Sequence, residues 1–172
     1  MQIRNIVLHA LMLGALSTGA LRAEAASVAW TRYVNPRFGT SAEVPAGFVA
    51  QPPPENEDGR TFASPDGGGE IRIYASNGPS VVTESFRAYE TWTAEAEVES
   101  GWTITYRARG KGWFALSGTR GESVVYQKAV AGCRGSVAHH VWISYPAGQK
   151  SRYDPIVARL GRSLRVGGRA AC

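Results

Sequence analysis

The sequence is poor in the residues that most often mark a chemical site. Its 172 residues include 2 cysteines and 3 histidines, and the histidines show neither H-x-x-x-H nor H-E-x-x-H spacing. The chain contains no P-loop, no G-x-S-x-G nucleophile motif, and no G-x-G-x-x-G after an expected strand. The sequence therefore predicts no catalytic residue, no metal and no cofactor.

The chain also lacks repeats, long linkers and dense runs of one charge. A composition that is 44% hydrophobic and 19% charged, with 20 glycines and 9 prolines, excludes collagen, a coiled coil and a disordered tail. It suits one β-rich domain. The formal net charge of +5 comes mostly from arginine and forms no stripe that would indicate nucleic-acid binding. Four arginines lie close together near the end of the chain: Arg159, Arg162, Arg165 and Arg169. We interpret them as a solvated helix face, with attraction to an anionic surface as the alternative.

Residues 1–25 have the pattern of a secretory signal peptide. Arg4 precedes the apolar run 6–16, and Ala23-Glu24-Ala25 fits an A-x-A cleavage site. A membrane anchor is disfavoured because the run is shorter than the roughly 20 residues that span a bilayer. We therefore expect cleavage near Ala25 and a single domain over residues 26–172. The mature protein is expected to be soluble, in the bacterial periplasm or secreted, without spanning a membrane.

Both cysteines, Cys133 and Cys172, lie in the expected mature chain. An even count in an oxidising compartment favours a disulfide between them, which would close a loop of roughly 40 residues. The alternative makes Cys133 a catalytic thiol, because His139 and His140 are near it in sequence. On a strand these adjacent histidines point to opposite faces, so we expect no shared metal and interpret His139 as a hydrogen-bonded residue of the core or of the sheet edge.

The hydrophobic pattern predicts several strands, one helix, four more strands and a final helix. The expected strands cover residues 30–34, 38–44, 60–64, 70–75, 102–109, 113–118, 124–130 and 137–145. On the fifth of these, Trp102 and Tyr106 share one face and are expected in the core. This order indicates an α+β sandwich in which two helices flank an antiparallel sheet of about six to eight strands.

Each expected helix has its own signal. After Pro79, apolar residues recur with helical period and polar ones occupy the opposite side. The expected apolar stripe consists of Val81, Val82, Phe86, Tyr89, Trp92 and Ala96. The second helix is expected to begin with Asp154 as its cap and Pro155 at its first position, because proline is tolerated there.

Three segments resemble known sequences. Residues 33–39 (Tyr-Val-Asn-Pro-Arg-Phe-Gly), with 44–48 (Val-Pro-Ala-Gly-Phe), resemble the start of PsbP-like domains. The end is similar too, with Tyr145-Pro146 followed by the segment 156–164. Residues 55–64, which follow the pattern E-N-x-D-G-R-x-F-x-S, resemble a segment of uncharacterised exported bacterial proteins.

The resemblance to PsbP-like domains implies an α/β sandwich and a mostly non-catalytic role. The superfamily includes a photosystem accessory protein, an envelope lipoprotein and a nuclear-import factor that binds a small GTPase. This chain lacks the lipid-acceptor cysteine of the lipoprotein members. No functional residue is transferred by the resemblance, because function belongs to sites rather than to folds.

Three residues are candidates for a binding surface: Asp58, Arg60 and Trp113. We expect Arg60 to pair with Asp58 or Glu55 and so to fix the proline-rich loop, which contains Pro52, Pro53 and Pro54; alternatively, its planar guanidinium holds an anionic ligand. Glu55, Glu57 and Asp58 are interpreted as solvated acids, because a calcium site needs six to eight oxygens. Trp113 follows a turn, where an exposed aromatic ring would suit a protein or glycan contact.

The sequence therefore favours a non-enzymatic, exported binding or accessory protein. Its expected partner is an envelope protein that recognises the open face of the sheet or the proline-rich loop. A small-ligand or metal carrier with a pocket between sheet and helix is the first alternative, and converging polar groups in a pocket would favour it. A hydrolase without a known motif is the second, and a nucleophile within hydrogen-bond reach of a histidine would favour that.

Overall fold

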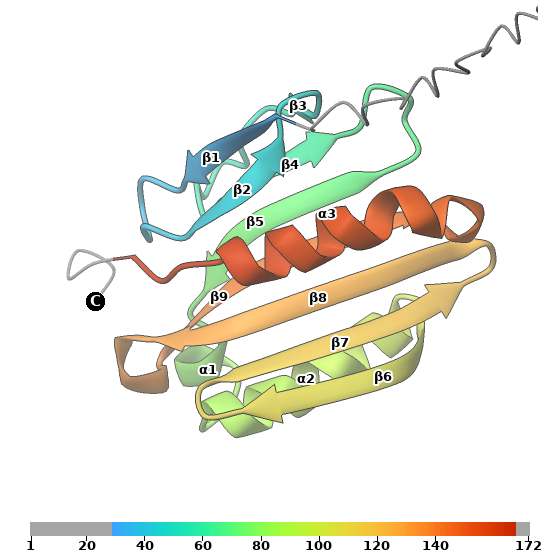
Figure 1. Ribbon diagram of the computed structural model, residues 1–172. Coiled ribbons are helices and arrows are strands. Elements are labelled where there is room, and N and C mark those ends of the chain that lie inside the picture. The colour runs from blue at the N-terminus through green and yellow to red at the C-terminus, as the bar shows by residue number, and fades with distance from the viewer. Residues whose placement is uncertain (1–28, 168–172) are drawn as a thin grey trace, which may run out of the picture.

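A computed structural model gives the fold of residues 29–167 (Figure 1). The strands are β1 (Trp30–Val34), β2 (Ser41–Pro45), β3 (Val49–Ala50), β4 (Gly59–Ala63), β5 (Glu70–Ser76), β6 (Thr103–Gly110), β7 (Trp113–Arg120), β8 (Ser123–Gly132) and β9 (Val137–Pro146). The helices are α1 (Gly78–Val81), α2 (Phe86–Glu99) and α3 (Lys150–Ser163). Among these residues no helix combines the length and the hydropathy that crossing a bilayer requires.

Seven of the strands form one antiparallel sheet with the order β3-β4-β5-β9-β8-β7-β6, and β1 pairs with β2 in a separate two-stranded sheet. The expected α+β class, the antiparallel sheet and the order of strands and helices are therefore confirmed. The turn at residues 65–69 joins β4 to β5, which pair as an antiparallel hairpin. The pairing of β1 with β2 alone was not expected from the sequence.

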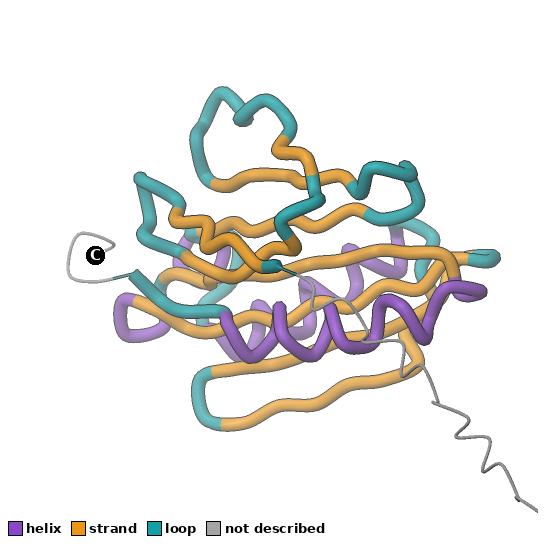
Figure 2. Tube along the Cα trace, turned by 45° about the horizontal axis from the view of Figure 1, so that its top comes forward, coloured by secondary structure: helices purple, strands orange, loops and turns teal. Residues whose placement is uncertain are grey.

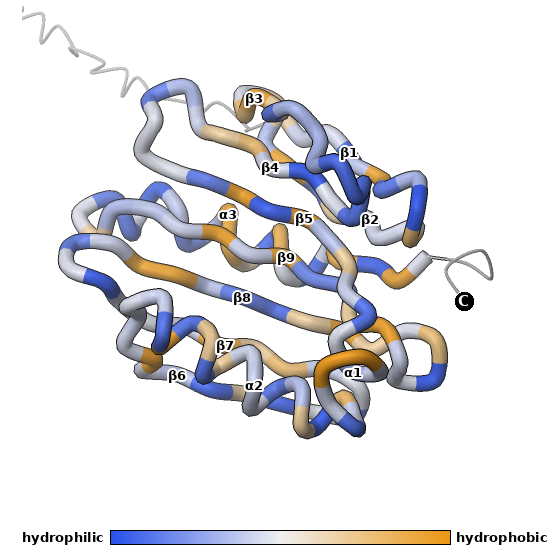
Figure 3. The backbone as a smooth tube through the Cα atoms, turned by 180° about the vertical axis from the view of Figure 1, so that it is seen from behind, coloured by the Kyte–Doolittle hydropathy of each residue, from blue (hydrophilic) through white to orange (hydrophobic). Residues whose placement is uncertain are grey.

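Helices cover both faces of the large sheet, and successive side chains of β9 point alternately to one face and to the other. Val141 and Ile143 point to the side of α3, whereas His140 and Trp142 point to the side of α2. Seen from behind, α1 and α2 lie at the β6–β7 end of the sheet, and no helix covers β4 and β5 there (Figure 3). We call this uncovered part of the sheet the open face.

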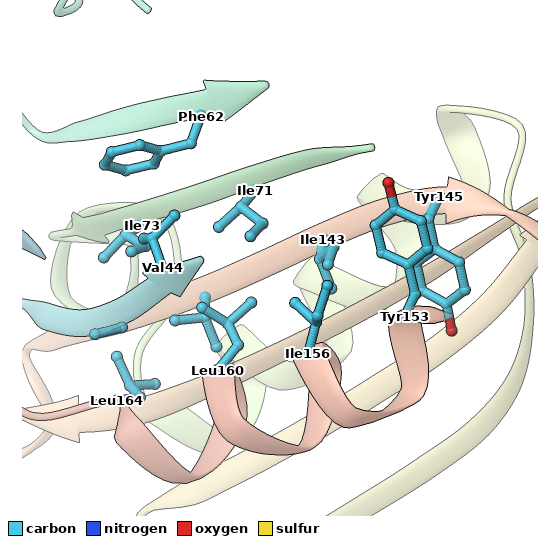
Figure 4. Close-up of a cluster of buried hydrophobic side chains, with 12 residues drawn as sticks. Val44, Phe62, Ile71, Ile73, Ile143, Tyr145, Tyr153, Ile156, Leu160 and Leu164 are labelled. Carbon is cyan, nitrogen blue, oxygen red and sulfur yellow. The ribbon is translucent and has the colours of Figure 1, made fainter. Parts of the chain in front are cut away.

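The main core lies between the sheet, α3 and the β1–β2 hairpin. Leu160 is fully buried and Ile156 points at the sheet, while the rings of Tyr153 and Tyr145 stack with centroids 4.7 Å apart (Figure 4). Burying one such aliphatic side chain contributes about 1.5–3 kcal/mol. The buried apolar side chains of α3 therefore hold this helix against the sheet.

The expected start of α3 was wrong. The helix begins at Lys150, so Asp154 is not its cap and Pro155 lies inside the helix. Asp154 instead accepts a hydrogen bond from the Lys150 ammonium at 2.6 Å. The missing N–H of Pro155 leaves the carbonyl of Ser151 without its helical partner, and Ser151 is exposed, so water can satisfy it.

The expected apolar stripe of the first helix was wrong in part. Val81 and Val82 precede α2 and are exposed, because the chain forms the short α1 and α2 begins only at Phe86. Trp92 is also exposed, whereas Glu90 is buried and pairs with Arg109 of β6 at 3.3 Å. Packing on the sheet thus selects a different face from the one that apolarity alone indicates.

Two strand expectations also need correction. Phe38 and Gly39 lie in the turn before β2 rather than in the strand, and Gly39 has a φ of 66° that glycine adopts without strain. Tyr106 is exposed although Trp102 is buried. The pairing of β6 with β7 shifts between Ile104 and Tyr106, and such a bulge reverses which side chains face the core.

Candidate binding groove beside the proline-rich loop

Two of the segments that resemble known sequences, residues 33–39 and 55–64, contact each other. These contacts fix the proline-rich loop, residues 51–58. The side-chain amide of Asn35, which is buried, donates to the carbonyl of Glu57 at 2.9 Å, and the Arg37 guanidinium donates to the carbonyl of Asn56. Glu57 has a φ of 52°, which is uncommon outside glycine. Figure 2 shows the loops at the β3–β4 edge of the sheet in teal. The loop is therefore held in one conformation by the turn that precedes β2.

A groove of about 390 Å³ lies between this loop and the open face of the sheet. We call it the loop groove. Its lining comes from the loop, β4, β5, β9 and α2: Pro52, Pro54, Asp58, Gly59, Arg60, Thr61, Arg72, Tyr74, Glu97 and Trp142. Segments far apart in the sequence thus build one surface, and it includes two of the three candidate residues.

Charged groups and an aromatic ring form the base of the loop groove. The guanidinium of Arg72 lies 4.3 Å from the centre of the Trp142 ring, and the Trp142 indole donates to the Glu97 carboxylate at 3.0 Å. Burial raises the pKa of the Glu97 carboxyl above its usual value, and the Trp142 hydrogen bond and Arg72 oppose that rise. This base carries both signs of charge.

The expected ion pair of Arg60 is wrong. The Arg60 guanidinium donates to the carbonyl of Gln51 at 2.8 Å, while the Asp58 carboxylate accepts from the side chain of Asn56 at 2.8 Å. The expected effect on the loop is nevertheless observed, because the Gln51 carbonyl lies at the start of that loop. Arg60 and Asp58 remain half-buried on the groove wall.

Trp113 is not part of the loop groove. It begins β7, pairs with Val130 of β8, and lies on the α3 face of the sheet, where the Lys128 ammonium is 5.7 Å from its ring centre. Three strands separate β4 from β7 in the sheet, and neighbouring strands are about 4.8 Å apart. The structure therefore separates the third candidate residue from the other two. The side chain is half-buried rather than fully exposed.

Sequence reasoning missed Arg72, Glu97 and Trp142 as groove residues. The alternation of β5 and β9 predicts that Arg72 and Trp142 leave the α3 face. It does not say that these two strands are neighbours. That pairing, and the position of the end of α2 above it, depend on the whole sheet.

His140 belongs to a buried polar network beneath the groove. The side-chain amide of Gln127 lies 3.1 Å from Nδ1 and the Tyr89 hydroxyl 3.2 Å from Nε2 of the imidazole. The ring stacks on Tyr74 with centroids 4.5 Å apart. Burial, with a smaller contribution from the neighbouring His139, lowers the pKa of His140 to about 3. His140 is therefore neutral and structural.

His139 lies on the opposite face, as expected, and is also buried. Its Nδ1 is 2.7 Å from the hydroxyl of Thr40, and both residues are inaccessible to solvent. A hydroxyl within reach of an imidazole is the arrangement that a hydrolase needs, but a substrate cannot reach this pair. Within residues 29–167, no three His, Cys, Asp or Glu side chains gather as a metal site would require.

Two expectations lie outside the residues that the structure describes. The signal peptide, residues 1–25, and Cys172 are both among them, so the cleavage and the Cys133–Cys172 disulfide stay predictions. Cys133 itself lies in a 3₁₀ turn between β8 and β9, where it packs against a small buried cluster that includes Val137.

Comparison with known proteins identifies the fold. No protein-family model and no curated protein sequence matches the chain. The fold is similar to that of the Ran-binding protein Mog1p of Saccharomyces cerevisiae, with a TM-score of 0.59 and 12% identity over 81% of this chain and 96% of that one. A mutant of the protein Mog1 gives a TM-score of 0.60 at 12% identity, over 83% and 98% of the two chains.

The third similar structure is cyanobacterial PsbP (CyanoP) from Synechocystis sp. PCC 6803, with a TM-score of 0.58 and 12% identity over 87% of this chain and 98% of that chain. At this identity the likeness concerns the fold alone. The described part of the chain therefore has the fold of PsbP and Mog1, as the resemblance of its sequence segments implied.

Proposed function

We propose that this chain is an exported, non-catalytic accessory protein that binds a protein of the bacterial envelope through the loop groove. The observation that carries the proposal is the construction of that groove. A loop fixed by Asn35 forms one wall, and the uncovered strands β4 and β5 form the base. A binding surface that is already ordered loses less conformational entropy when a partner docks.

The composition of the loop groove suits a protein surface. Its lining carries the acids Asp58 and Glu97 and the bases Arg60 and Arg72 around the Trp142 ring. Aromatic and arginine side chains are enriched at the centres of protein interfaces, and charges of both signs set the orientation of a partner. Mog1p, which has a similar fold, is itself described as Ran-binding, so this fold can serve a protein partner.

Site-specific photo-crosslinking in the intact envelope tests the proposal. A photoreactive phenylalanine analogue replaces Thr61, which lines the groove, and the matched control places it at Thr105, which is exposed on β6 at the far edge of the sheet. We expect a discrete protein adduct from position 61 only, and we expect Arg72→Glu to abolish it. The absence of an adduct at 61, or the same adduct from both positions, would contradict the proposal.

A further inference from the structure

A second groove runs along α3 on the opposite face of the sheet. Its volume is about 480 Å³, and it lies between α3 and the β1–β2 hairpin with the turn that follows it. We call it the α3 groove. Its base is apolar and includes the half-buried rings of Trp30 and Phe48 together with Ile156. Another hollow of about 380 Å³ shares Arg159 and Arg162 with it and continues it toward the end of the helix.

Arginines dominate the rim of these two hollows. Five line them: Arg32, Arg152, Arg159, Arg162 and Arg165. Two carboxylates form ion pairs with three of these arginines. Glu43 pairs with both Arg32 and Arg159, and Asp66 pairs with Arg152. The neighbouring guanidinium groups hold the pKa of the Glu43 carboxyl below its usual value, so Glu43 is ionised and already engaged.

The rim therefore keeps an excess of positive charge. Arg162 and Arg165 form no ion pair among residues 29–167, and the Arg165 guanidinium donates to the backbone carbonyls of Arg162 and Leu164. The guanidinium of Arg159 lies 4.5 Å from the centre of the Trp30 ring, which joins the charged rim to the apolar base. Such a surface is complementary to an anionic occupant that also has an apolar part.

We propose that the α3 groove binds an extended, acidic segment of a partner protein, with one apolar side chain of that segment seated against Trp30 and Phe48. Arg152 and Arg162 are ten residues apart, which is about 15 Å along a helix. An extended peptide covers that length with about five residues. Several carboxylates on one chain can therefore engage successive guanidinium groups, each through paired hydrogen bonds.

The spacing of the arginines along the groove favours an acidic peptide segment over other anions. A small carboxylate would engage one or two of the arginines and leave the others unpaired. A membrane surface would favour apolar side chains that project beyond the charges, whereas Ile156 is buried and Trp30 lies beneath Arg159. The proposal is independent of the loop groove, because the two grooves lie on opposite faces of the sheet.

Selection from a displayed library of random twelve-residue peptides tests the proposal with the purified protein. We expect the enriched sequences to contain several Asp or Glu residues around one bulky apolar residue. A labelled peptide of the enriched sequence should bind about tenfold more weakly to Arg162→Glu and should weaken as salt rises. The matched control is Arg107→Glu on β6, which changes the net charge equally and should leave the affinity unchanged.

A second variant tests the apolar base. Phe48→Ala should weaken the same peptide and abolish its preference for a bulky side chain, and circular dichroism confirms that the variant is folded. The proposal is overturned if the enriched peptides lack acids or if Arg107→Glu weakens binding as much as Arg162→Glu. It is also overturned if the protein binds anionic phospholipid vesicles and none of the acidic peptides.

Discussion

The buried His140 makes the stability of this protein sensitive to mild acid. Its imidazole contacts Tyr89, Gln127 and Tyr74, and none of these side chains supplies a negative charge, because burial raises the pKa of both tyrosines. The folded protein therefore keeps His140 neutral until the pH approaches its lowered pKa of about 3. In the unfolded chain the same group titrates near 6.5.

The sign and size of the effect follow from this difference. Between these two pKa values the unfolded chain binds a proton that the folded chain does not, so the free energy of unfolding falls as the pH falls. Integration from pH 6.5 to 4.5 gives a loss of about 2 kcal/mol from His140 alone. Burial also lowers the pKa of His139, which adds to the loss in the same direction.

Urea unfolding at a series of pH values measures this loss, and His140→Phe provides the comparison. The variant should be less stable at pH 7.5, because Gln127 and Tyr89 lose a hydrogen-bond partner. Between pH 6.5 and 4.5, however, its free energy of unfolding should fall by about 2 kcal/mol less than that of the wild-type protein. Should the variant not fold, NMR of the wild-type imidazole gives the pKa directly. A folded protein whose His140 protonates above pH 5.5 would refute the reasoning.

Three further outcomes are expected. Gly59→Ala should destabilise the protein by about 1–3 kcal/mol, because an added Cβ would lie 2.4 Å from that of Tyr74, whereas Gly148→Ala, with no atom within 4 Å, should change little in the same thermal melt. Mass spectrometry of the exported protein should show the loss of residues 1–25, and an intact N-terminus would contradict the signal-peptide prediction. Thiol labelling of the denatured, unreduced protein should find no free cysteine, and Cys172→Ser should lower the melting temperature by an amount equivalent to roughly 3–4 kcal/mol. An unchanged melting temperature would contradict a stabilising disulfide.

Local hydrophobic patterns predicted strands and helices well where side-chain periodicity alone decides which residues are buried. The alternation of Ile71 and Ile73 with Arg72 and Tyr74 identified the two faces of β5, because a strand repeats every two residues. The pattern was less informative for α2, where Glu90 is buried. Its carboxylate is compensated by Arg109 on β6, and a helical period carries no information about a partner on another element.

In the candidate site, too, local sequence patterns identified some residues, whereas contacts between distant elements decided the position of others. Asp58 and Arg60 were identified from a proline-rich loop that ends in an acidic turn, and both line the loop groove. Trp113 was chosen for its place beside a turn, but the strand order separates it from β4 by three strands, and the alternation along β7 puts its side chain on the α3 face. The ion pair expected of Arg60 failed because the Gln51 carbonyl, brought close by the pairing of β3 with β4, provides an acceptor.

The sequence by itself determined the fold class, the order of the elements and the placement of His139 and His140 on opposite faces of their strand, because these depend on local periodicity and polarity. Only the tertiary structure decided that β5 lies beside β9 and that Asn35 holds the proline-rich loop. Only the tertiary structure, too, gathers arginines of α3 and of the β1–β2 hairpin around the α3 groove and the hollow that continues it. Both grooves are made by residues distant in sequence, and such contacts are set by the packing of the whole sheet rather than by any one segment.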